Sequence, residues 1–82
     1  MIQHSTAIFD KANGFLQFIS PSADPMTALK QFDDEVGVDP NGEGLEAIRE
    51  HYDFYICTPE QVALLEAEDC RNATPRGYKI GF

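Results

Sequence analysis

The residues of this chain that are best suited to chemistry are carboxylates, and they gather in its middle third. Between residues 33 and 50 the chain holds seven acidic side chains and a single base, Arg49. Exposed carboxylates on successive helical turns are spaced roughly as phosphates are along a nucleic-acid backbone. We therefore interpret this segment as a partner-binding surface suited to a basic groove, where charge complementarity speeds association and gives specificity. The residues assigned to this surface are Asp33, Asp34, Glu35, Asp39, Glu43, Glu46 and Glu50.

Residues 39–50 of this segment also follow the spacing of a calcium-binding loop. Oxygen-bearing side chains fall at the first, third, fifth and twelfth places, and Gly44 stands sixth, where the turn requires glycine. The segment resembles an EF-hand loop, although Glu46 occupies the eighth place, which is apolar in that family. Calcium is therefore the alternative to the partner-binding interpretation. The ligands that the resemblance implies are Asp39, Asn41, Glu43, the carbonyl of Leu45, and Glu50.

The cysteines and histidines give little support to catalysis. Cys57 and Cys70 fit no zinc-binding pattern, and His4 and His51 are too few for a metal centre. Cys57 ends an apolar run just before a predicted helix, where we expect it to pack in the core. The sequence contains no Gly-rich phosphate loop, GxSxG elbow or HExxH motif. We therefore expect a protein that is not an enzyme, with no catalytic residues and no cofactor.

Composition excludes several classes of function. The chain has 82 residues, with 14 Asp and Glu against 6 Lys and Arg, and its net charge is −8. This charge argues against direct binding to nucleic acid or to an anionic membrane. No apolar run approaches the roughly 18–20 residues that a membrane span needs. Residues 1–5 lack the basic and apolar parts of an export signal, so we expect a cytoplasmic protein.

Apolar periodicity and turn residues predict the elements that must position these side chains. The length allows one compact domain, residues 1–82. Asp24 and Pro25 are typical of a helix start, Gly37 of a helix end, and Thr58 to Gln61 of a capping box. The predicted order is β-β-α-(α)-β-α-β, with strands over 5–9, 15–20, 53–57 and 78–82 and helices over 25–36, 45–51 and 59–69.

This pattern predicts an α+β fold in which helices pack on one face of a four-stranded, mostly antiparallel sheet. Residues 15–20 are apolar on both faces, which places that strand in the centre of the sheet. The last strand alternates Tyr78, Ile80 and Phe82 on one face, and we expect it at an edge. On the first helix Phe32 lies in the middle of the apolar stripe, so it should pack on the sheet near Phe18 and Ile56.

Three functional hypotheses follow from these features. The first is a non-catalytic acidic module that binds a protein partner by occupying its basic, nucleic-acid-binding surface. In size and charge such a module is similar to the phage and mobile-element proteins that inhibit host defence, anti-CRISPR proteins among them, and this similarity implies nucleic-acid mimicry. The second is a calcium-binding domain that uses residues 39–50. The third is a small accessory subunit that pairs with its partner through an edge strand.

Overall fold

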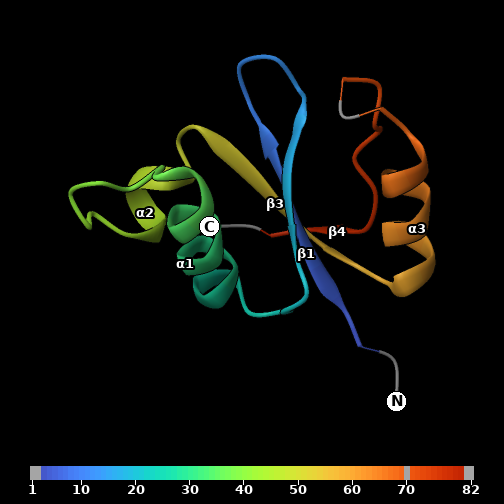
Figure 1. The fold of residues 1–82 in the computed structure, drawn as a ribbon, viewed down its shortest axis with the longest axis horizontal. Helices are drawn as coiled ribbons and strands as arrows, with labels where there is room; N and C mark the ends of the chain where they lie inside the picture. The colour runs from blue at the N-terminus through green and yellow to red at the C-terminus, as the bar shows by residue number, and fades with distance from the viewer. Residues whose placement is uncertain (1–2, 70, 81–82) are drawn as a thin grey trace.

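The computed structural model describes residues 3–69 and 71–80, and its elements follow the predicted order along the chain (Figure 1). The strands are β1 (Ser5–Asp10), β2 (Leu16–Ser20), β3 (Tyr52–Cys57) and β4 (Tyr78–Lys79). The helices are α1 (Pro25–Val36), α2 (Leu45–Ile48) and α3 (Pro59–Ala67). The four strands of the described residues form one antiparallel sheet in the order β2-β1-β3-β4. The predicted α+β class is confirmed.

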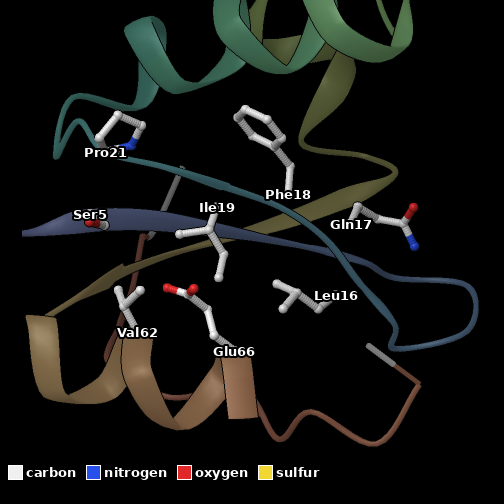
Figure 2. A pocket seen from close by; sticks show the side chains of 8 residues that line it. All are labelled: Ser5, Leu16, Gln17, Phe18, Ile19, Pro21, Val62 and Glu66. Atoms are coloured by element: carbon white, nitrogen blue, oxygen red, sulfur yellow. The ribbon is translucent and has the colours of Figure 1, made fainter. Parts of the chain in front are cut away.

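The order of the strands differs from the prediction at β2, which lies at an edge and not in the centre. The pairing of β2 with β1 also contains a β-bulge. Ile8 pairs with Phe18, but the next residue of β1, Phe9, pairs with Leu16, so Gln17 is an extra residue. The bulge turns Phe18 towards α1 and Leu16 towards α3 (Figure 2). An edge strand thus carries apolar residues on both faces. The predicted edge position of β4 is confirmed, and Phe82 lies outside the described residues.

The helices cover both faces of the sheet, whereas the sequence predicted that they would share one (Figures 1 and 2). The three consecutive β1 residues Ala7, Ile8 and Phe9 are all buried, so each face of the sheet needs an apolar cover. One core cluster joins the sheet to α1 and α2, and it consists of Ile8, Ala28, Leu29, Phe32, Ile48 and Phe54. The other joins the sheet to α3 and the segment that follows it, and it consists of Ala7, Phe9, Cys57, Leu65 and Ala73.

Local signals fix both ends of α1 and the start of α3 as predicted, whereas α2 and α3 end earlier than predicted, at Ile48 and Ala67 instead of residues 51 and 69. At the start of α1 the Asp24 carboxylate accepts hydrogen bonds from the Thr27 nitrogen and hydroxyl. The hydroxyl contact lowers the pKa of Asp24. Gly37 ends α1 in the left-handed conformation, with φ of 75°. Thr58 and Gln61 form a reciprocal capping box at α3. None of the helices described is long and apolar enough to cross a membrane.

Candidate functional site

The predicted acidic segment forms one lobe of the molecule, and we call residues 33–50 the acidic lobe. It comprises the last turn of α1, the α1–α2 loop, α2 and the turn that follows, on the opposite side of the sheet from α3 (Figure 1). Two of its seven carboxylates, those of Asp33 and Asp39, are half-buried. The other five are exposed, and they belong to Asp34, Glu35, Glu43, Glu46 and Glu50.

The two half-buried carboxylates hold the loop in place. Asp33 Oδ1 accepts a hydrogen bond from the Asp39 nitrogen at 2.7 Å, which ties the end of α1 to the loop. Asp39 Oδ1 accepts from the Glu43 nitrogen at 2.8 Å, and its Oδ2 accepts from the Gly44 nitrogen at 2.9 Å. Asp33 and Asp39 therefore act inside the lobe as structural acceptors, and the position of Glu43 depends on them.

The acidic lobe carries seven carboxylates against one base, Arg49. The ion pairs found among the described residues join Lys11 and Lys79 to Asp53, and Arg76 to Glu68. None of these pairs includes a carboxylate of the acidic lobe. None of the five exposed carboxylates therefore forms an ion pair within the described part of the chain, although Arg49 belongs to the lobe and Lys11 borders the same hollow as Glu50. A partner with a complementary basic surface would supply that compensation.

The carboxylates of the lobe border two separate hollows. Asp34 and Glu35 line a hollow of about 350 Å³ beside Phe18 on β2. Glu50 lines another, of about 460 Å³, beside Lys11 on the β1–β2 turn and Tyr52 on β3. Burial, with a smaller contribution from the nearby Asp10 carboxylate, raises the pKa of Tyr52. The seven predicted residues thus share one lobe, but they do not converge on a single point.

The loop does not assemble the calcium ligands that its resemblance implied. Both carboxylate oxygens of Asp39 accept backbone hydrogen bonds, and the Leu45 carbonyl accepts one from the Arg49 nitrogen at 2.9 Å inside α2. Among residues 3–69 and 71–80, no three His, Cys, Asp or Glu side chains come together as a metal site requires. The carboxylates of Asp39, Glu43 and Glu50 therefore do not form such a group.

Cys57 packs in the core, as predicted. Its side chain is fully buried at the end of β3, and its Sγ lies 3.2 Å from the carbonyl oxygen of Arg76. Burial raises the pKa of this thiol, which disfavours the thiolate that a nucleophile needs. Cys70 lies outside the described residues. His51 is exposed, and its backbone carbonyl accepts from the Lys11 nitrogen, so it supports the β1–β2 turn.

A further surface, between β2 and α3, was missed by the sequence reasoning. A hollow of about 520 Å³ lies there, and Figure 2 shows Leu16 and Ile19 of β2 facing Val62 and Glu66 of α3. The signal for it in the sequence is the apolar character of both faces of residues 15–20, which also predicts a central strand. At an edge, the same apolar residues are left partly uncovered.

Comparison with known proteins adds no relative: no family model, no curated protein and no solved structure matches this chain.

Proposed function

We propose that this chain is a non-catalytic, acidic protein-binding module that occupies a basic, nucleic-acid-binding surface of a partner protein in the cytoplasm. The observation that carries this proposal is the uncompensated charge of the acidic lobe. Five exposed carboxylates there form no ion pair among the described residues, and the lobe's single base, Arg49, balances only one of its seven negative charges, while ion pairs form elsewhere in the molecule. The carboxylates of such a surface repel one another in the free protein, and a bound cationic surface would relieve this repulsion.

The anchoring of the loop supports the same function. Because Asp33 and Asp39 fix the loop through backbone hydrogen bonds, the exposed carboxylates are presented on an ordered frame. A preorganised surface loses less conformational entropy on binding than a flexible acidic tail does. We infer a mode of action in which the carboxylates take the places of nucleic-acid phosphates, as an inhibitor of a nucleic-acid-binding complex would need. The similarity in size and charge to phage-encoded inhibitors agrees with this role.

A pair of matched charge reversals tests the proposal. Glu46 and Glu60 are both exposed and both lie in the first turn of a helix, but Glu46 belongs to the acidic lobe and Glu60 to α3. Wild type, Glu46→Lys and Glu60→Lys would each be used to capture partners from a cell extract, and the proteins retained would be identified by mass spectrometry. Circular dichroism would establish that both variants remain folded.

The proposal predicts that Glu46→Lys weakens capture of the partner by roughly tenfold or more, because it places a cation in a basic groove. Glu60→Lys changes the net charge equally and should capture the partner as wild type does. Capture that is lost to the same extent in both variants would indicate a response to net charge alone. Capture that neither variant disturbs would contradict the proposal.

A further inference from the structure

The outer side of β2 has no strand beside it in the part of the chain that the structure describes. The Asp10 nitrogen donates to the Phe15 carbonyl at 2.9 Å, so the even-numbered residues of β1 bond to the β2 side. The bulge residue belongs to β2, and the alternation along β1 is therefore unbroken. The odd-numbered residues of β1 therefore direct their N–H and C=O groups towards β3. Ala7 is one of them, and it pairs with Ile19 without hydrogen bonds between the two. Ile19 consequently turns its own N–H and C=O groups outwards, to the open edge.

A hollow flanks this edge on each face of the sheet. On the α3 face, the hollow of about 520 Å³ is lined by Leu16, Ile19 and Val62, with Glu66 beside them (Figure 2). On the α1 face, the hollow of about 350 Å³ lies beside Phe18, and the carboxylates of α1 border it. Side chains of a strand added to β2 would point alternately into these two hollows. The first is largely apolar and the second is acidic.

We propose that β2 accepts an extended segment of a partner protein as a fifth strand, and that this segment alternates apolar residues with Lys or Arg. An apolar residue opposite Ile19 would enter the hollow that faces α3. The basic residues on either side of it would stand over Phe18 and Ser20, near Asp34 and Glu35. The choice of a basic partner rests on the proposed function, whereas the strand pairing rests on the open edge alone.

A basic strand fits this edge better than a second copy of the chain or a partner helix would. A second copy of the chain would bring its own β2, Leu16–Ser20, which contains no base. It would also bring a second set of carboxylates towards Asp34 and Glu35, and like charges at close range oppose association. A partner helix would fill an apolar groove but leave the outward N–H and C=O groups of Ile19 without hydrogen bonds, because a helix satisfies its own backbone. A basic strand would form hydrogen bonds with the backbone of β2 and also place its side chains in both hollows.

Peptide probes test the proposal directly. The probe is a fluorescein-labelled, seven-residue peptide that alternates Lys and Val, and its binding to the full chain is followed by fluorescence anisotropy. The added strand is proposed to run antiparallel to β2, as the other neighbouring strands of the sheet do, and in this arrangement the Val nitrogens face β2 and the inner Lys nitrogens face away. Two further peptides carry N-methyl groups, one at its Val nitrogens and the other at its inner Lys nitrogens. All three peptides have the same charge, so a surface that merely attracts cations cannot distinguish them.

The expected result is that methylation of the Val nitrogens weakens binding by roughly tenfold or more, whereas methylation of the inner Lys nitrogens leaves it within about threefold. On the protein, Ile19→Pro removes the outward N–H without removing a bond to β1, and Ile19→Ala is its matched control. We expect the proline variant to bind the unmethylated peptide roughly tenfold more weakly than the alanine variant. If the proline variant does not fold, the methylated peptides decide the question with wild-type protein.

Two outcomes would overturn strand addition. One is equal binding of the two methylated peptides, and the other is no binding of the unmethylated peptide up to about 1 mM. Either result would leave the acidic lobe as a separate binding surface, since its own test depends on Glu46 and Glu60. Conversely, loss of the selectivity between Glu46→Lys and Glu60→Lys would contradict the proposed function without affecting the pairing of β2.

Discussion

Asp39 offers the sharpest test of how the acidic lobe is built. Its carboxylate accepts two hydrogen bonds, from the Glu43 and Gly44 nitrogens, at 2.8 and 2.9 Å. A hydrogen bond to a charged group contributes about 1.5–3 kcal/mol to stability. Because Glu43 is exposed, water can replace part of the first bond when the carboxylate is removed. We therefore expect Asp39→Ala to lower the free energy of unfolding by about 2 kcal/mol.

Guanidinium denaturation followed by far-ultraviolet circular dichroism measures this loss, and amide hydrogen exchange locates it. The Glu43 and Gly44 amides should exchange faster in Asp39→Ala, while amides of the β1–β3 pairing should keep the protection that the global stability gives them. The matched control is Asp34→Ala, which removes an exposed carboxylate of the same lobe and should change stability by no more than about 0.5 kcal/mol.

Equal stabilities of Asp39→Ala and Asp34→Ala would refute this reasoning, because the loop would then not depend on the Asp39 carboxylate. Asp39→Asn provides an intermediate case, since its amide keeps one oxygen acceptor and lacks the charge. Its stability should fall between those of wild type and Asp39→Ala.

Three other predictions concern the core, the alkaline limit and calcium. Phe32 is 1% exposed and packs against the Phe18 and Tyr52 rings, so Phe32→Ala should lose about 3–5 kcal/mol in chemical denaturation, and a loss under ~1 kcal/mol would contradict this packing. Burial raises the pKa of Tyr52 above the ordinary tyrosine value of 10.0, so the unfolded chain ionises first as the pH rises past that value. The free energy of unfolding should therefore fall above pH 10.0, and it should fall less steeply in Tyr52→Phe. Millimolar calcium should leave the melting temperature unchanged, whereas a rise of more than ~5 °C that Glu50→Gln abolishes would establish the calcium alternative.

The elements of the fold could be predicted from the sequence because the signals that begin and end them are local. Asp24, Gly37 and Thr58 act on backbone groups within a few residues, and the structure places each of them where the pattern indicated. The position of Phe32 against Phe18 followed from helical periodicity in the same way. These parts of the prediction needed no knowledge of how distant segments meet.

The arrangement of the sheet could not be predicted, because it depends on the pairing of distant residues. One extra residue, Gln17, reverses which β2 side chains share a face, and nothing near it in the sequence marks the bulge. The burial of both faces of β1 also depends on distant residues, because α1 covers one face of the sheet and α3 covers the other. Strand order and helix placement were therefore the two points that needed correction.

The acidic lobe was foreseen as a concentration of charge but not as a structure. Counting residues reveals seven carboxylates, yet it does not distinguish Asp33 and Asp39, which accept backbone hydrogen bonds, from the five that remain exposed. That distinction depends on the path of the loop, which brings the Asp39 nitrogen back to α1. It also determines which substitutions test binding and which test folding.

Competition with nucleic acid tests the central claim most directly. The captured partner would be purified and bound to the labelled chain, and single-stranded DNA or RNA would be titrated into the complex at ~0.05 M and ~0.5 M salt, where the Debye length falls from about 14 to about 4 Å. If the acidic lobe occupies a nucleic-acid-binding surface, nucleic acid should displace the chain completely, and the higher salt should weaken the complex by orders of magnitude. A complex that nucleic acid does not displace and that high salt does not weaken would contradict the account.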